Sequence, residues 1–492
     1  MSAKFRAAAT LVVAITAVSN ASCQEPRGGG ERARAAPALT ARDAEQRVML
    51  SFYSSSDDQF EIGETYYVAA NEPGASNNNN GRFPSYHSGT DGPFKDLNDS
   101  RIRSLLAGER GVKMILREGV YRLERLDGSD SGVILNGSGD ERRPIILAGH
   151  PGETAILDGG ETLTRDQLLG IRGGESYDIE IQQTVTLEGR YNILENLTIR
   201  DGFRYNVLVL GKYSIVRGNR LQGAFEDSIK TVEGADYGLI ANNEISGFAS
   251  QGIDSFGSTF WLVKNNDIHH PQLDPVTDVI EANGIGGKGG VEDYVIIGND
   301  IHDFDTNRRV GALAFGGGGD LSLYRKDALR RLRPAATRIM AFGNTIRDYN
   351  GPAVYFQSCS DCMFVGNTVS NTLGGASLGL APDEYEAKTN RGLPMTRNAT
   401  IRDNRFVGNH AGLDVCREGG NLPVGTTCFA LFINSLEAAD GLMAEGNVYF
   451  SDTPPRFALR SDKVVLLTRD ELRDRLGVEQ TSEVRPLDEF ER

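Results

Sequence analysis

Two lysines and two aspartates are the residues of this sequence whose types and spacing best suit chemistry. Lys230 follows Asp227 by three residues in DSIKTV, Asp254 lies in QGIDSF, and Lys288 lies in NGIGGKGG. A lysine amine can remove a proton from carbon when a neighbouring cation lowers its pKa, and carboxylate oxygens can hold a metal ion. These residue types therefore predict proton transfer next to a charged group.

The glycine-rich segment around Lys288 invites a second interpretation, a phosphate-binding loop. Such a loop, GxxxxGK[ST], needs serine or threonine after the lysine and a helix that begins there. Gly289 follows Lys288 instead, and the next segment, YVIIGNDI, has the pattern of a strand. We therefore interpret the glycines as a flat floor from which Lys288 projects.

An internal repeat must position these residues. Segments such as SIVRGNRL and YVIIGNDI recur, each with an asparagine in the same place: Asn219, Asn243, Asn266, Asn299, Asn344, Asn367, Asn404 and Asn447. Counted from Asn196 in the variant NILENLTI, the spacings are 23, 24, 23, 33, 45, 23, 37 and 43 residues. They indicate a coil of 23 or 24 residues with insertions in some turns.

A repeat of this length, made of short strand-like segments, is typical of a parallel β-helix. In this all-β solenoid the stacked coils share one core. Asparagine suits a recurring turn because it tolerates left-handed backbone, and stacked asparagines would form an internal ladder. The LxxLxLxxN spacing of a leucine-rich repeat is absent, and a propeller blade needs about 40 residues.

A second strand precedes each asparagine-bearing segment, in SIKTV, GIDSF, GIGGK, ALAFG and AVYFQ. Because strand side chains alternate between faces, apolar anchors that face the core leave the flanking positions outside. These outward positions are Lys230 and Val232, Asp254 and Phe256, Gly286 and Lys288, Ala314 and Gly316, and Tyr355 and Gln357. Coils lie about 4.8 Å apart, so the two lysines would be roughly 10 Å apart with Asp254 between them. Insertions at 270–281, 317–335, 381–394 and 414–428 would wall a groove beside this sheet.

The two ends of the solenoid carry helix signals. DSRIRSLLAGERG predicts a helix that caps the N-terminal end, and Thr468 with Glu471 predict the capping box of a short C-terminal helix. We expect an export signal over 1–22, a flexible tether over 23–45, the β-helix over 46–452 and a C-terminal cap or tail over 453–492.

The N-terminus is typical of a bacterial export signal, with MSAKFR basic, AAATLVVAITAV apolar and SNASCQ rich in small residues. Cys23 lies where a lipoprotein signal places its lipidated cysteine. We therefore expect an exported protein that is periplasmic, outer-membrane-tethered or extracellular, with membrane contact only through a lipid on Cys23. We also expect a monomer.

The other four cysteines fit an oxidising compartment. Cys359 with Cys362, and Cys416 with Cys428, would form structural disulfides, although a CxxC pair can also be redox-active or bind metal. The net charge of −15 disfavours a nucleic-acid partner, which needs a basic face. It permits an acidic polysaccharide held by a local basic site or a bound cation.

The coils over about 190–450 resemble the bacterial pectate-lyase-type superfamily of right-handed parallel β-helices. DSIKTV and NGIGGKGG are similar to its NGFK-type lysine segment, and QGIDSF resembles its DGFD-type calcium segment. The resemblance implies a polysaccharide lyase that cleaves a uronate-containing polysaccharide by β-elimination. It implies Lys230 and Lys288 as catalytic residues, Asp254 and Asp227 as metal ligands, and calcium as the cofactor.

Two other functions remain open. A glycoside hydrolase would need two or three carboxylates grouped across neighbouring coils, and a carbohydrate-binding or adhesive solenoid would need no catalytic group. Each lysine also fits a plain solvated charge, and Asp254 a simple ion pair. His269, His270 and His302 follow the asparagine strands at expected turn positions, where we predict no metal partner.

Overall fold

The computed structural model describes residues 59–108, 111–125, 130–160, 167, 181–272, 282–305, 311–317, 324, 326, 332–378, 393–408, 429–433, 435–452, 454–460 and 464–490. Phe60–Arg492 form one compact unit, distinct from Met1–Gln59. The predicted export signal, the tether and Cys23 lie outside the described residues, as do Cys416 and Cys428. Most of the insertions expected to wall a groove lie outside them too.

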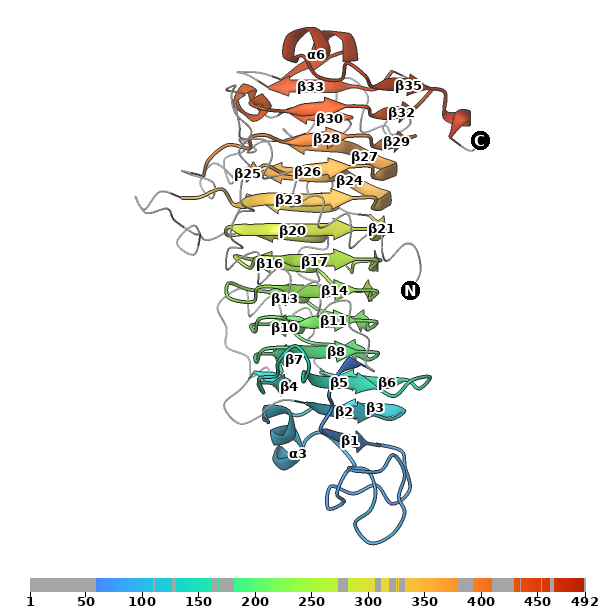
Figure 1. Cartoon of the computed structure of the whole chain (residues 1–492). Coiled ribbons are helices and arrows are strands. Elements are labelled where there is room, and N and C mark those ends of the chain that lie inside the picture. Colours follow the sequence, from blue (N-terminus) through green and yellow to red (C-terminus); the bar gives the residue numbers. More distant parts are fainter. Residues whose placement is uncertain are drawn as a thin grey trace, which may run out of the picture. The chain divides into compact units, whose positions relative to one another are not determined.

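Stacked parallel strands make up nearly all of the regular secondary structure of the described unit (Figure 1). One sheet, sheet 1, has 13 strands within the described residues. Its strands are β1 (Glu64–Val68), β2 (Val112–Leu116), β5 (Ile145–Gly149), β8 (Asn192–Glu195), β11 (Ile215–Arg217), β14 (Gly238–Ala241), β17 (Trp261–Lys264), β20 (Val291–Ile297), β23 (Ala336–Phe342), β25 (Cys359–Ser360), β26 (Met363–Val365), β28 (Thr400–Arg402) and β31 (Met443–Glu445).

The other sheet, sheet 2, consists of two series of strands. The first series is β4 (Ser131–Leu135), β7 (Gln183–Leu187), β10 (Tyr205–Val209), β13 (Asp227–Thr231), β16 (Gln251–Phe256), β19 (Asn283–Lys288), β22 (Leu313–Gly316), β30 (Leu431–Ile433) and β33 (Phe457–Arg460). The second series is β3 (Gly119–Arg122), β6 (Ala155–Asp158), β9 (Thr198–Arg200), β12 (Arg220–Gln222), β15 (Glu244–Ser246), β18 (Asp267–His269), β21 (Asp300–Phe304), β29 (Arg405–Val407), β32 (Val448–Phe450) and β35 (Glu483–Arg485). The long strands β24 (Thr345–Gln357) and β27 (Thr368–Leu378) run through both series, so the two count as one sheet.

Each coil therefore has three strands, one from each series of sheet 2 and one from sheet 1. The coil that contains Lys230 runs through β13, β14 and β15, and each of these pairs in parallel with its counterpart on the next coil. The predicted parallel β-helix is confirmed.

The predicted apolar anchors share one core position. Ile229, Ile253, Ile285, Leu313 and Val354 are fully buried and lie in register on consecutive coils of the first series. One cluster of buried apolar residues extends from Tyr66 to Val478. No single coil can bury its apolar face, so stacking supplies the stability of every coil.

The predicted asparagine ladder is also confirmed. From Asn243 to Asn447, the side-chain oxygen of each ladder asparagine accepts a hydrogen bond from the backbone N–H of the preceding one, at 2.9 to 3.2 Å. The same oxygen accepts from the preceding side-chain Nδ2, at 2.9 to 3.1 Å. Ser482 and Glu479 accept the last bonds from Asn447.

The backbone reason given for the asparagines needs correction. The left-handed conformation belongs to the residue before each ladder asparagine, such as Gly218, Asn242 and Gly298, with φ of 63°, 55° and 66°. Asn196 is one of these preceding residues, with φ 55°, and Leu197 takes the ladder position after it. The ladder asparagines are therefore selected for their buried side-chain hydrogen bonds.

Both predicted end helices are present. Residues of the N-terminal segment form α3 (Ser100–Ser104) and the short 3-10 helix η2 (Leu105–Ala107). At the C-terminus, Thr468 and Glu471 form the predicted capping box of α6 (Arg469–Leu476). Strand β34 (Val464–Leu467) pairs antiparallel with β33, and 3-10 helices η5 (Leu436–Ala439) and η6 (Leu487–Glu489) complete this end. Within the described residues, no helix is long and apolar enough to span a membrane.

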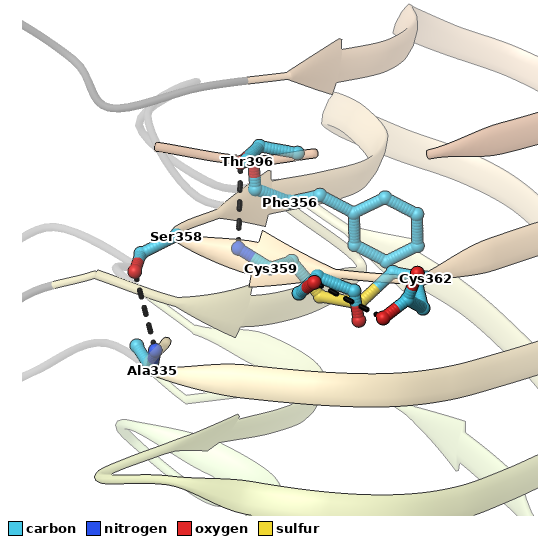
Figure 2. The surroundings of a disulfide bond; sticks show 8 residues. Ala335, Phe356, Ser358, Cys359, Cys362 and Thr396 are labelled. Atoms are coloured by element: carbon cyan, nitrogen blue, oxygen red, sulfur yellow. Dashed lines mark hydrogen bonds between the residues drawn. A yellow bond between two sulfur atoms is a disulfide. The ribbon is translucent and has the colours of Figure 1, made fainter. Parts of the chain in front are cut away.

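Cys359 and Cys362 form a disulfide between β25 and β26 (Figure 2). Both cysteines are fully buried. Nearby, Thr396 Oγ1 accepts a hydrogen bond from the Cys359 backbone N–H and donates one to the Phe356 carbonyl. The disulfide is thus part of the packed core of its coil, which confirms the structural interpretation for this pair.

Candidate functional site

The predicted outward row of the first series is confirmed by strand register. Lys230 pairs with Asp254, Asp254 with Gly286, Gly286 with Ala314, and Ala314 with Tyr355. Successive coils thus place the candidate residues side by side, because each anchor side chain points into the core and the next residue points out.

Lys230 forms a compact ion cluster with two aspartates. Its ammonium donates hydrogen bonds to Asp254 Oδ2, on the next coil, and to Asp227 Oδ2 at 3.3 Å. The exposed fractions of the side chains are 15% for Lys230, 5% for Asp227 and 2% for Asp254. A buried ion pair is strong only when its charges are fully compensated, and one lysine here compensates two carboxylates.

Burial and charge shift the protonation of this cluster. Burial disfavours the charged form of Lys230, but the carboxylates of Asp254 and Asp227 outweigh that cost and raise its pKa. Burial, and then the nearby Asp254 charge, raise the pKa of Asp227 to about 7. Lys230 is therefore held as an ammonium, whereas a lysine base needs a lowered pKa.

The second oxygen of each aspartate has no hydrogen-bond partner within the described residues. Both Oδ1 atoms, of Asp227 and of Asp254, are buried from solvent. An unpartnered buried carboxylate oxygen costs free energy, about 1 to 3 kcal/mol or more for a charged group. The cluster is therefore incompletely paired.

Lys288 lies two coils beyond Lys230 and two residues further along its strand. It pairs in register with Phe256, and it makes no ion pair with the described residues. Its positive charge still reaches the cluster, because it favours the ionised form of Asp227. The structure thus places Lys288 beside the Lys230 cluster without joining it.

The flat glycine floor predicted around Lys288 is only partly present. Gly286 alone of the five glycines lies on the outward row, and a Cβ there would lie 2.0 Å from the Gln251 side-chain oxygen. A Cβ on Gly284 would meet Ile301 of the core, and Gly289 has a φ of 76° in the turn. The glycines are therefore needed for different reasons: Gly284 and Gly286 because neighbouring side chains leave no room for a Cβ, and Gly289 because of its left-handed backbone.

Aromatic residues that the sequence did not single out border the ion cluster. The Lys230 ammonium lies 5.9 Å from the centre of the Tyr205 ring, on the coil before it. Tyr324 packs edge-on against Phe256 and donates a hydrogen bond to the Gly317 carbonyl. Aligning the coil before Lys230 in the sequence would have found Tyr205, since it pairs in register with Asp227.

The aspartates were tested as a calcium site. Calcium takes six to eight oxygen ligands. Within the described residues Asp227 and Asp254 do not converge with a third metal-ligating side chain, and the Lys230 ammonium lies between them. With Lys230 in place, these residues do not fit a calcium ion. The predicted calcium cofactor is therefore tested by a binding experiment.

Comparison with known proteins agrees with this fold. Residues 231–429 match the family model described as "Right handed beta helix region". No curated protein matches the chain. With the three-strand coils described above, this match defines a right-handed parallel β-helix protein. The chain thus has the fold of the right-handed parallel β-helix superfamily.

Several solved structures are similar over most of their length. Pectate lyase Pel9A is 13% identical, with 82% of this chain and 78% of that chain covered and a TM-score of 0.34. XylC in complex with xylose is 12% identical, with 86% of each chain covered and a TM-score of 0.43. The Azotobacter vinelandii mannuronan C-5 epimerase AlgE4 A-module is 12% identical, with 90% and 93% covered and a TM-score of 0.41.

Proposed function

We propose that this protein is an exported polysaccharide lyase that cleaves an acidic, uronate-containing polysaccharide by β-elimination. The observation that carries the proposal is the Asp227–Lys230–Asp254 cluster on the outer face of the first series, with Lys288 nearby. The two lysines offer the base and the cation that β-elimination needs, and few other groups are required.

The proposed reaction assigns a different role to each lysine. Lys288, which has no ion-pair partner among the described residues, accepts the proton from the carbon next to the uronate carboxylate. The electron pair left on that carbon forms a carbon–carbon double bond as the glycosidic carbon–oxygen bond breaks. The departing oxygen takes a proton from water. Lys230, kept as an ammonium by its two aspartates, stabilises the charge that develops on the carboxylate.

A glycoside hydrolase is the second candidate, and a specific observation favours it. Hydrolysis uses two carboxyl groups, one protonated and one ionised. Asp227 and Asp254 meet at one ammonium, and the pKa of Asp227 is raised to about 7. Asp227 would then be the acid and Asp254 the nucleophile or base.

One assay separates these functions. The purified protein is incubated with pectate, alginate and glycosaminoglycans, with calcium or with a chelator, while ultraviolet absorbance reports unsaturated uronate and a second assay reports reducing ends. We expect absorbance on one polymer, abolished in Lys288→Ala and Lys230→Ala but unchanged in Lys212→Ala. Lys212 is a control lysine in the turn between β10 and β11, and its side chain is 42% exposed.

The other outcomes are equally informative. Reducing ends without absorbance, lost in Asp227→Asn, would replace the lyase with the hydrolase. If neither assay gives a signal but the protein is retained on a polysaccharide column, the protein is a carbohydrate-binding solenoid without catalytic activity. Loss of activity with the chelator would make calcium part of the mechanism in spite of the poor ligand set.

A further inference from the structure

Two identical tetrapeptides lie side by side on the second series, away from the Lys230 cluster. Asn-Asp-Ile-His ends at His269 on one coil and at His302 on the next. In both, isoleucine is fully buried and the asparagine belongs to the ladder, so aspartate and histidine share the outer face. Register then pairs Asp267 with Asp300, and His269 with His302.

These side chains converge. One ligand atom each from Asp267, Asp300 and His302 lies within 4.8 Å of the other two. His302 Nε2 lies 2.8 Å from Asp267 Oδ1, and the His269 ring stacks on the His302 ring with centres 5.2 Å apart. We predicted these histidines at turns, and that placement is wrong for His269 and His302, which lie in β18 and β21. The neighbouring coil thereby brings carboxylates beside His302.

The converging atoms are held by further contacts. His302 Nδ1 is hydrogen-bonded to Asp303 Oδ2 at 2.6 Å, which fixes the ring and leaves Nε2 directed at Asp267. Asp300 Oδ2 accepts a hydrogen bond from Arg347 at 3.2 Å, while its Oδ1 is buried with no partner among the described residues. A carboxylate that orients a histidine through its far nitrogen is the usual outer support of a metal ligand.

Charge along this column also favours a cation. Glu244, Asp267 and Asp300 occupy one register position on three consecutive coils. Like charges directly opposite each other destabilise a sheet. Arg220 compensates Glu244 at 2.6 Å and Arg347 compensates Asp300, but among the described residues Asp267 pairs only with His302. A cation between Asp267 and Asp300 would remove the remaining repulsion.

We propose that Asp267, Asp300 and His302 bind a divalent transition-metal ion of the zinc class, with His269 beside the site. Imidazole and carboxylate ligands suit zinc, and three protein ligands leave a position for water. The metal takes the place of the hydrogen bond between His302 Nε2 and Asp267 Oδ1. The site joins two coils and lies on a different face from the Lys230 cluster, so it does not depend on the proposed lyase activity.

The test is a calorimetric titration of the metal-free, oxidised protein with zinc chloride, and with calcium chloride as a second probe. We expect one zinc per chain and no competition from calcium. Asp267→Asn and His302→Ala should weaken binding by about 100-fold or more, and Asp303→Asn, a positioning residue, by about 10- to 100-fold. His87→Ala, a matched histidine remote from the site in sequence, should bind as the wild type does.

Three results would overturn the proposal: no zinc binding at one per chain, equal binding by the wild type and Asp267→Asn, or equal displacement by calcium. A cobalt(II) titration gives an independent readout. A visible spectrum without a thiolate charge-transfer band supports imidazole and carboxylate ligation, and such a band would assign the metal to cysteines instead. Asp267 is 53% exposed, so Asp267→Asn keeps the test valid even if His302→Ala fails to fold.

Discussion

The asparagine ladder and the Lys230 cluster are both rows of buried polar groups, but they differ in how completely those groups are paired. From Asn243 onwards, each ladder side-chain oxygen accepts two hydrogen bonds. Each Nδ2 donates to the next side-chain oxygen and to a backbone carbonyl, as Asn243 does to Asn266 and Val216. In the cluster, Asp227 Oδ1 and Asp254 Oδ1 have no partner among the described residues.

This difference distinguishes the polar groups of the ladder from those of the proposed site. Fully paired buried groups stabilise one arrangement of the coils, whereas incompletely paired groups keep capacity for a ligand at a cost in stability. A third arrangement, the Asp267 and Asp300 column, is more exposed and has one buried oxygen without a partner.

Removing the lysine should break the cluster with the largest effect. Lys230→Met leaves Asp227 and Asp254 buried together without a cation, so we expect a loss of about 3 to 5 kcal/mol in the free energy of unfolding. Urea unfolding measures it. Lys288→Met is the matched control and should stay within about 0.5 kcal/mol. Equal losses in both variants would show that the cluster contributes no special stability.

Breaking the ladder should cost somewhat less. Asn299→Ala deprives the Asn266 backbone N–H and Nδ2 of their common acceptor, so we expect a loss of about 2 to 4 kcal/mol. Thermal or urea unfolding measures it, with the exposed Asn78→Ala as the control. A loss similar to that of the control would mean that water replaces the missing oxygen.

The disulfide should contribute less again, because it closes a short loop. Replacing both Cys359 and Cys362 with alanine should lower the free energy of unfolding by about 2 kcal/mol or less. A reducing agent should destabilise the wild type by a similar amount and leave the double variant unchanged. Insensitivity of the wild type to reduction would contradict a stabilising bond.

The last expected effect is a pH dependence that sharpens the view of Asp227. Its folded pKa, about 7, lies above its ordinary value of 3.8, so the folded state favours the protonated acid. Its contribution to stability is therefore present below about pH 4 and lost as pH rises towards 7, at up to about 1.4 kcal/mol per pH unit.

That slope is measured as the difference in unfolding free energy between the wild type and Asp227→Asn, which cannot titrate at this position. The difference should become less favourable to the wild type from pH 4 to pH 7. A difference that is flat or moves the other way would mean that Asp227 stays ionised as a partner of Lys230.

The coil, its core and its outward row could all be predicted from the sequence, for physical reasons. The repeated asparagine marks one point of every coil, and strand alternation then assigns a face to each neighbour. Lys230 and Asp254 were therefore placed correctly in the same row. Their ion pair was only one of several interpretations of the sequence. Charge pairing depends on side-chain positions, which strand alternation does not determine.

Other features depend on contacts between coils that local pattern does not reveal. Gly286 was interpreted as open floor, but the Gln251 side chain from the preceding coil occupies that space. His302 was interpreted alone, although its partner Asp267 comes from 35 residues earlier. Aligning neighbouring coils by their ladder asparagines would have found both NDIH segments.

The ladder also has a consequence for how this chain can change over time. Asn243 and Asn266 are 23 residues apart, and Asn299 and Asn344 are 45 apart, yet the hydrogen bonds that join them are equally 2.9 Å long. Inserted residues thus leave the coil-to-coil distance unaltered. The core fixes the axial repeat while each coil can gain or lose surface sequence, so new binding segments can arise by insertion without renewed selection for folding.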